Sequence, residues 1–259
     1  MKQFQIDAFT DRLFAGNPAA IVPLEAWLDE ALMQSIAREN NLSETAFFVP
    51  VAGGYQLRWF TPNSEVDLCG HATLAAAYVL FKELGYQGES LRFHTRSGEL
   101  TVINHGKHME MDFPSQLSTP CAAPQALLEG LGVEPVEVLV AEDYLVVLES
   151  EQQVRALQPD FAKLAQLERR GVAVTALGEQ VDFVSRFFAP KVGINEDPVT
   201  GSAHCQLVPY WSEKTSKCTF HARQLSARGG ELWCQLEVDR VIISGNAVKF
   251  MEAELNIEY

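Results

Sequence analysis

The sequence has no hydrophobic run long enough to cross a bilayer, which takes about 20 consecutive apolar residues. Its longest run extends from Ala72 to Phe81, is interrupted only by the hydroxyl of Thr73, and ends at Lys82. The first residues, Met1 to Asp7, include polar side chains where a secretory signal peptide needs an apolar stretch. We therefore expect neither a membrane-spanning helix nor a signal peptide.

Paired cysteine motifs are also absent. The five cysteines are an odd number, are widely spaced and form no Cys-x-x-Cys pair; they are Cys69, Cys121, Cys205, Cys218 and Cys234. Secreted domains that depend on disulfides usually carry an even number of cysteines at close spacings. The pattern is typical of reduced thiols in a cytoplasmic protein.

Positive charge is scarce. Lys and Arg total 20 against 34 Asp and Glu, which gives a formal net charge of -14 at pH 7, and no cluster of basic residues breaks this balance. Such a surface repels phosphate backbones, so neither nucleic acid nor a membrane surface is expected as a partner. What remains is an ordinary globular composition with 47% hydrophobic residues. A chain of 259 residues has the length of one large domain or two small ones.

An internal repeat divides the chain into two halves. Three short matches recur in the same order at an offset of about 130 residues, which is far longer than the unit of a solenoid and indicates a duplicated domain. The matched segments are 58–62 with 186–190, 70–72 with 201–203, and 97–100 with 229–232. We expect a first half over residues 1–115, on which the C-terminal residues, about 247–259, can pack back, and a second half over 116–246.

Each half is predicted to contain a curved sheet wrapped around one buried helix. The helix predicted over 70–84 is apolar nearly all round, as is typical of a helix buried on most faces. Its counterpart is predicted over 202–213, with Pro209 bending it, and a further helix is predicted over 24–39. Strands are predicted over 4–9, 19–22, 44–49, 55–60, 91–95, 100–103, 108–113, 136–140, 144–148, 172–176, 183–188, 218–225, 232–238 and 241–243.

The two buried helices start in a matched way, with Gly70 after Cys69 and Gly201 after Thr200. Glycine lets a ligand approach the backbone closely, and the unpaired amides of a first helical turn favour an anion. The pattern favours a small carboxylate bound between two facing helix starts. The alternative is that Asp67, Asp197 and Thr200 are only capping and loop residues.

Glu44 is the first candidate for proton transfer. It stands between a predicted helix end and a very apolar strand, where a carboxylate is poorly solvated, and this suits a general acid or base. The alternative is a surface glutamate at a turn. Asn17, in the segment 14–19, is a candidate ligand-binding residue whose alternative interpretation is a turn residue.

Taken together, these segments resemble the PhzF-like (phenazine biosynthesis-like) family within the diaminopimelate-epimerase fold superfamily. The resemblance covers both halves in the family's order and rests on the motifs Gly-Asn-Pro-Ala at 16–19, Ser-Glu-Thr-Ala-Phe at 43–47, Cys-Gly-His-Ala-Thr at 69–73 and Asp-Pro-Val-Thr-Gly-Ser-Ala at 197–203. It implies an α+β fold of two pseudo-symmetric barrel-like halves, each a curved, mostly antiparallel sheet around a central helix. It also implies an active site in the interdomain cleft, a homodimer and no cofactor.

The resemblance also assigns roles. In the characterised branch, the glutamate that corresponds to Glu44 is the general acid/base in a proton-shifting isomerisation of a dihydro-hydroxyanthranilate. His71 and Asp197 are expected to assist catalysis, although His71 could simply hydrogen-bond its own helix end. Substrate binding is expected from Gly70, Gly201, Ser202, Thr200 and Asn17, and no metal is expected.

Three other functions stay open. Racemases of the superfamily use two facing cysteines, but here Cys69 faces a position filled by Thr200, so a racemase or epimerase would have to work with one thiol. A binding protein that kept the cleft without turnover is a second alternative. Metal-dependent hydrolysis is a third, although His204 with Cys205, or His105 with His108, lacks a third ligand. The sequence does not reveal the substrate.

Overall fold

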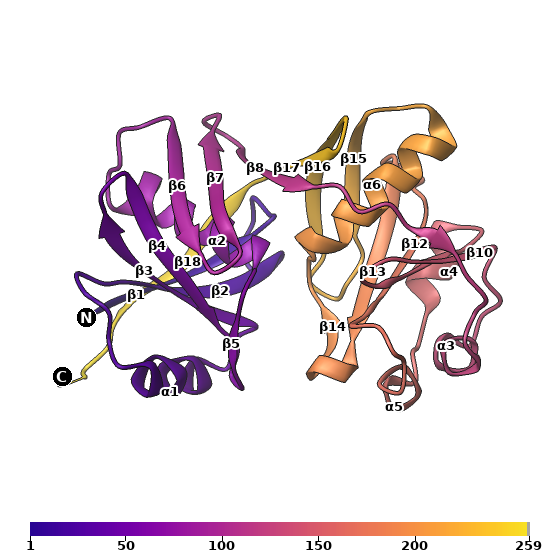
Figure 1. Cartoon of the computed structure of the whole chain (residues 1–259), viewed down its shortest axis with the longest axis horizontal. Helices are drawn as coiled ribbons and strands as arrows, with labels where there is room; N and C mark the ends of the chain where they lie inside the picture. The colour runs from indigo at the N-terminus through magenta and orange to yellow at the C-terminus, as the bar shows by residue number, and fades with distance from the viewer. Residues whose placement is uncertain (258–259) are drawn as a thin grey trace. The chain divides into compact units, whose positions relative to one another are not determined.

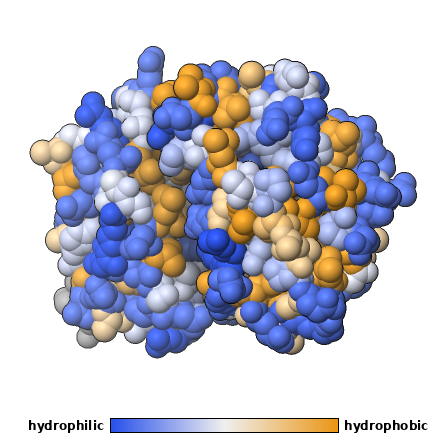
Figure 2. Space-filling view, turned by 45° about the vertical axis from the view of Figure 1, so that its right-hand side comes forward, coloured by the Kyte–Doolittle hydropathy of each residue, from blue (hydrophilic) through white to orange (hydrophobic). Residues whose placement is uncertain are grey.

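The computed structural model describes residues 1–257 and shows a mixed α+β protein with much sheet and few helices (Figure 1). The chain divides into two compact units. Unit 1 consists of Met1–Asp112 and the chain from Ser244 onward, and unit 2 consists of Phe113–Ile243. None of the helices in the described part of the chain has both the length and the apolarity needed to cross a bilayer. Hydrophilic side chains cover much of the face shown in Figure 2, with hydrophobic patches among them.

Unit 1 is built from strands on either side of a buried helix. Its elements are β1 (Lys2–Ala8), β2 (Asn17–Pro23), α1 (Glu30–Asn40), β3 (Glu44–Val51), β4 (Gly54–Phe60), β5 (Glu65–Val66), α2 (Gly70–Tyr78), the π-helical turn η1 (Val79–Glu83), β6 (Ser90–Thr95), β7 (Gly98–Asn104), β8 (Met109–Pro114) and β18 (Ala247–Glu254). Strand β18 pairs antiparallel with β1 along its whole length, so the C-terminal segment completes this sheet.

Unit 2 has a similar order of elements. They are β9 (Thr119–Pro120), α3 (Gln125–Leu131), β10 (Glu137–Val140), β11 (Tyr144–Val147), α4 (Glu151–Ala156), α5 (Phe161–Leu164), β12 (Val172–Leu177), β13 (Phe183–Ala189), the 3₁₀ turn η2 (Pro190–Val192), β14 (Ile194–Asp197), α6 (Gly201–Thr215), β15 (Thr219–Gln224), β16 (Gly230–Glu237) and β17 (Arg240–Gly245). Helices α3 to α5 were not predicted from the sequence.

The strands of the two units pair in the same succession. In unit 1, β1–β2 is antiparallel, β2–β3 parallel, β3–β4 and β4–β5 antiparallel, β4–β6 parallel and β6–β7 antiparallel. In unit 2, β10–β11, β11–β12, β12–β13, β13–β14, β13–β15 and β15–β16 follow the same sequence of orientations.

The two units also share an ion pair at corresponding positions. Arg58 on β4 donates from Nε to Glu65 on β5 at 2.7 Å, and its guanidinium lies over the ring of Phe60 at 5.2 Å. In unit 2, Arg186 on β13 donates from Nε to Glu196 on β14 at 2.7 Å. Its guanidinium lies over the ring of Phe188 at 5.0 Å. The repeated Arg-x-Phe sequence therefore makes the same pair of contacts twice.

Helices α2 and α6 are the buried helices that the sequence predicts. Residues 71–77 of α2 are all buried, and the helix packs against β1, β2, β3 and β18. In α6, Gly201 and residues 203–211 are buried. A helix this apolar on every side is stable only when sheet surrounds it, because most of its stability comes from packing.

Two predicted helices differ from those observed. The helix predicted over 24–39 begins only at Glu30, because the Leu24 amide donates to Phe48 O at 2.9 Å and prolongs the sheet, while Asp29 caps the first turn by accepting from Ala31 N. The helix predicted over 70–84 changes to π geometry after Tyr78. Pro209 lies inside α6. The carbonyl of Cys205, which loses its helical partner at Pro209, accepts instead from Gln116 N at 2.9 Å.

Candidate active site

The first cluster of candidate residues lies in unit 1, where two parallel strands begin beside the start of α2. Asn17 is the first residue of β2, and Glu44 is the first of β3, with which β2 pairs in parallel. His71 is the second residue of α2. All three side chains are buried, with exposed fractions of 0%, 8% and 6%. Since β3 is buried along its first six residues, its opening carboxylate has little access to water.

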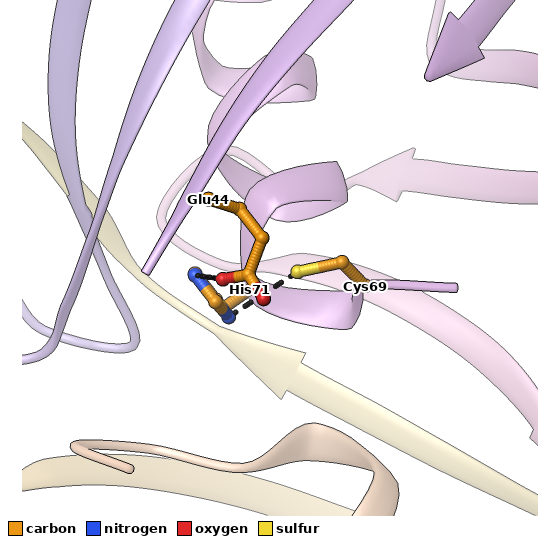
Figure 3. Close-up of side chains that lie close together, drawn as sticks. All are labelled: Glu44, Cys69 and His71. Carbon is orange, nitrogen blue, oxygen red and sulfur yellow. Dashed lines mark hydrogen bonds and ion pairs between the residues drawn. The ribbon is translucent and has the colours of Figure 1, made fainter. Parts of the chain in front are cut away.

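A carboxylate–imidazole pair forms the centre of this cluster (Figure 3). Oε2 of Glu44 lies 3.0 Å from Nε2 of His71. Neither atom has another partner among the described residues. The other ring nitrogen, Nδ1, lies 3.2 Å from the amide nitrogen of Asn17 and 3.5 Å from the sulfur of Cys69. His71 therefore contacts Glu44 through one ring nitrogen and Cys69, the N-cap residue of its own helix, through the other.

The charges in this cluster follow from burial and from the short distances. Burial and the neighbouring Glu44 raise the pKa of Cys69 to about 11, so the thiol is neutral at pH 7. Burial alone lowers the pKa of His71, but Cys69 and Glu44 beside the ring raise it. The resulting pKa lies well above the ordinary value of a histidine. With a neutral thiol, the Glu44 carboxylate is the charge that holds an imidazolium here.

The second cluster lies in unit 2 around the loop between β14 and α6. Asp197 is buried, and its Oδ2 accepts a hydrogen bond of 2.5 Å from the hydroxyl of Thr200. The side chain of Gln224, at the end of β15, donates to Asp197 O at 2.8 Å and accepts from Thr200 N at 2.9 Å. The loop is therefore fixed from both ends by one amide side chain, which the sequence analysis did not single out.

The starts of α2 and α6 differ from those of α1, α4 and α5. In the latter three helices an Asp or Ser side chain caps the first-turn amides. In α2 and α6, the N-cap residues Cys69 and Thr200 make no such bond, and neither first turn contains an acidic residue. Amides that no capping side chain satisfies favour an anionic ligand.

Ser202, in the first turn of α6, accepts a hydrogen bond of 3.0 Å from Nη2 of Arg170. Arg170 in turn makes a two-pronged ion pair with Asp143, whose exposed fraction is 1%. No sequence motif contains Arg170 or Asp143, so neither residue could be singled out before the structure was known.

A metal ion is a second possible use of the first cluster. One ligand atom each from Glu44, Cys69 and His71 lie within 4.8 Å of one another, and this mixed donor set suits zinc. However, Glu44 lies against Nε2 of His71 and Cys69 lies against Nδ1, and a single metal ion binds only one nitrogen of an imidazole ring. The geometry suits a carboxylate–imidazole ion pair better than a metal centre. His204, the other metal candidate, is buried and donates from Nδ1 to Thr200 O at 2.8 Å.

The structure thus brings the predicted site residues together in two groups. Asn17, Glu44, Gly70 and His71 gather in unit 1, and Asp197, Thr200, Gly201 and Ser202 gather in unit 2.

Several known proteins resemble this chain over nearly its whole length. Residues 6–253 match the family of phenazine biosynthesis-like proteins (PhzC-PhzF). An uncharacterized isomerase of Pseudomonas aeruginosa is 56% identical over 254 residues, which cover 98% of each chain. The crystal structure of a PhzF-family protein from Enterococcus faecalis matches with a TM-score of 0.97 at 47% identity over 99% of each chain. A probable proline racemase from Agrobacterium radiobacter, 9% identical, matches with a TM-score of 0.66 over 99% of this chain and 93% of that one and so shares the fold alone.

The fold and the relatives define the class of the protein, which is an isomerase with the fold of the proline racemases. More particularly, the chain belongs to the phenazine biosynthesis-like (PhzF) family, since both the family match and the relatives span almost its whole length.

Proposed function

We propose that the chain is a cofactor-independent isomerase that moves a proton between carbon atoms of a small carboxylate, with Glu44 as general acid and base. The observation that supports this most is the contact of 3.0 Å between Glu44 and His71, two buried ionisable groups without another described partner at the contacting atoms. Buried groups of this kind are expensive to maintain and gather at catalytic sites.

The proposed reaction is a proton shift that Glu44 completes alone. Its carboxylate takes the proton from one carbon of the substrate, and the electron pair of the broken C–H bond stays on the substrate. Glu44 then returns the proton to a different carbon, so no other reactant is consumed. His71 balances the negative charge of Glu44 before the first step. Asn17 can face His71 Nδ1 with either its amide oxygen or its nitrogen, and so serves both protonation states of the ring.

The second cluster is proposed to hold the substrate carboxylate. The uncapped amides at Gly201 and Ser202, and those at Gly70 in unit 1, can donate to its oxygens and to charge that develops on them. Asp197 is proposed to hold an amino or hydroxyl group of the substrate. The same order of elements in both units supports the inference that each is a barrel-like sheet around a central helix.

A racemase that uses Cys69 is the competing proposal. A thiol whose pKa is raised to about 11 is a poor base near neutral pH, since very little of it is ionised. The matched N-cap position of α6 holds the hydroxyl of Thr200 rather than a second thiol. The buried carboxylate of Glu44 therefore fits the task better.

Proton exchange in deuterated water tests this proposal. The wild-type protein is incubated with dihydro-hydroxyanthranilate, the substrate type of the characterised branch, and carbon-bound deuterium is measured by mass spectrometry. We expect exchange with the wild type and with Glu39→Gln, an exposed control at the end of α1, and a loss of at least about a hundredfold with Glu44→Gln. Equal exchange in Glu44→Gln would reject the role of Glu44.

The family also leads us to propose a homodimer in the cytoplasm. All five cysteines are free, as expected for a reducing compartment. Sedimentation equilibrium should give twice the chain mass of 28.7 kDa, and a value equal to the chain mass would reject the dimer.

A further inference from the structure

The segment between β10 and β12 contributes two residues to the start of α6. Asp143 lies just before β11, and its backbone is held by Gln206 of α6. The amide of Asp143 donates to Gln206 Oε1 at 3.1 Å, and Gln206 Nε2 donates to Asp143 O at 3.3 Å. Since Gln206 stands four residues after Ser202, Asp143 is fixed one helical turn from the Ser202 side chain.

Arg170 connects Asp143 to Ser202. Its Nε and Nη2 donate to the two carboxylate oxygens of Asp143 at 3.1 Å and 2.6 Å, and Nη2 also donates to Ser202 Oγ at 3.0 Å. The guanidinium lies over the ring of Phe187 at 5.5 Å. The planar fork of an arginine, held on both sides, has little freedom to turn away from Ser202.

The bond from Arg170 determines what the hydroxyl of Ser202 can do. A guanidinium only donates, so Ser202 must accept from it and keeps its own hydrogen for another group. A serine in a helix often donates this hydrogen to the carbonyl four residues earlier. For Ser202 that carbonyl belongs to Pro198, which accepts from Ser226 Oγ at 2.8 Å, and among the described residues the hydroxyl of Ser202 is bonded to Arg170 instead. In α2, by contrast, Thr73 does donate to Cys69 O, at 2.6 Å.

We propose that the Asp143–Arg170 pair positions Ser202 as a hydrogen-bond donor to a substrate carboxylate at the start of α6. The inference rests on the proposed function, from which it takes the carboxylate. Asp143 and Glu142, whose Oε1 lies 3.5 Å from Nη1, offset the charge of Arg170, so Arg170 contributes mainly orientation. Arg170 is a positioning residue, because it affects the binding of the carboxylate only through the hydroxyl of Ser202.

A double-mutant cycle on ligand binding tests this chain of contacts. Calorimetry measures the Kd of 3-hydroxyanthranilate, the aromatic analogue of dihydro-hydroxyanthranilate, for the wild type, Ser202→Ala, Arg170→Met and the double variant. Each single change should weaken binding by about ten- to a hundredfold, as loss of a bond to a charged group does. The double variant should bind no more weakly than Ser202→Ala. Wild-type binding by Arg170→Met, or losses that multiply in the double variant, would overturn the proposal.

Two further variants separate positioning from folding. Arg170→Met leaves the buried Asp143 carboxylate without its partner. We therefore combine Arg170→Gln with Asp143→Asn in one variant, which removes both charges and keeps side chains of similar shape. This variant should keep the wild-type melting temperature within a few degrees, and it should show the same loss of binding. Arg155→Met is the matched control, because it breaks a comparable ion pair with Glu151 and should bind as the wild type does. Wild-type binding by the charge-free variant would reject the positioning role.

The same measurements distinguish this inference from the proposed function. A wild type that binds 3-hydroxyanthranilate but gives no carbon-bound exchange would reject the isomerisation, and the cycle would still decide the role of Arg170. A wild type that binds neither 3-hydroxyanthranilate nor acetate at millimolar concentration would reject a carboxylate partner for Ser202, and with it this inference.

Discussion

Two buried histidines in this protein have pKa values shifted in opposite directions, because burial lowers both pKa values and the groups beside His71 reverse the effect there. Cys69 and the Glu44 carboxylate lie beside the ring of His71 and raise its pKa well above the ordinary value, against the effect of burial. His204 has only a backbone carbonyl, and burial lowers its pKa to about 4. A raised pKa adds stability that is present below pH 6.5 and is lost as the pH rises through the folded value. A lowered one adds stability that is present above pH 6.5 and is lost as the pH falls toward 4.

We therefore expect opposite titrations when histidine ring signals are followed by NMR. The ring of His71 should be cationic at pH 7, and that of His204 should stay neutral until the pH approaches 4. Because the unfolded chain takes up a proton on His204 between pH 6.5 and 4 and the folded protein does not, the free energy of unfolding should fall by about 3 kcal/mol over this range. The variants His71→Asn and His204→Asn assign the two signals. A neutral His71 at pH 6 would contradict the charge pairing with Glu44.

Cys69 provides a sharp test between the two proposed mechanisms. We expect Cys69→Ser to keep exchange activity within about threefold, because a neutral thiol with a raised pKa contributes packing and one weak contact to His71. The measurement is the same deuterium incorporation, with Cys205→Ser as the control for a buried thiol in a central helix. Abolished exchange in Cys69→Ser alone would favour the one-cysteine racemase.

At the scale of single residues, sequence motifs predicted the members of both clusters, but contacts between distant residues required the structure. Glu44 and His71 belong to recognisable sequence motifs, yet their contact depends on how β3 and α2 lie beside each other. Arg170 belongs to no such motif. It reaches Ser202 only because β11 and β12 pair in parallel, which places the residues before each strand side by side.

At the scale of elements, α2 should be very sensitive to loss of volume. Leu74 is completely buried in the middle of this helix. Leu74→Ala should lower the free energy of unfolding by about 2–5 kcal/mol, because it removes buried methyl groups and leaves a cavity. Leu117→Ala, at a side chain with an exposed fraction of 78%, should change it by less than about 0.5 kcal/mol. Urea denaturation measures both, and equal small effects would show that α2 is not packed as described.

The predicted helices show where periodicity succeeds and where it fails. The apolar pattern located α2, because burial on all sides leaves a strong signal, and the repeat located α6 as its counterpart. The same kind of spacing placed a helix from Leu24 onward. Leu24, Trp27 and Leu28 do pack against the core beside α1, but as an irregular segment. Periodicity detects that a residue faces the core, and it cannot tell which hydrogen bonds its backbone makes.

At the scale of the whole molecule, three short segments made the repeat visible in the sequence. Of these, the Arg-x-Phe strands make the same ion pair in both units, whereas the two helix starts make different side-chain contacts. Between β11 and β12, unit 2 has α4 and α5 where unit 1 has α1 alone between β2 and β3. Such connections vary freely because they lie outside the shared strand pairing, so no repeat could predict them.

The chain is also not divided simply into a first and a second half, since β18 returns to unit 1 and pairs with β1 from Lys2–Glu254 to Ala8–Ala247. A chain of residues 1–243 would leave β1 as an unpaired edge and would remove one of the strands against which α2 packs. Hydrogen exchange measured by mass spectrometry should then show lost protection in β1, β2 and α2, with β11–β13 still protected because unit 2 is continuous in sequence. Adding a peptide of residues 244–257 should restore protection, whereas a scrambled peptide should not. Full protection of β1 in the shortened chain would mean that unit 1 folds without its C-terminal strand.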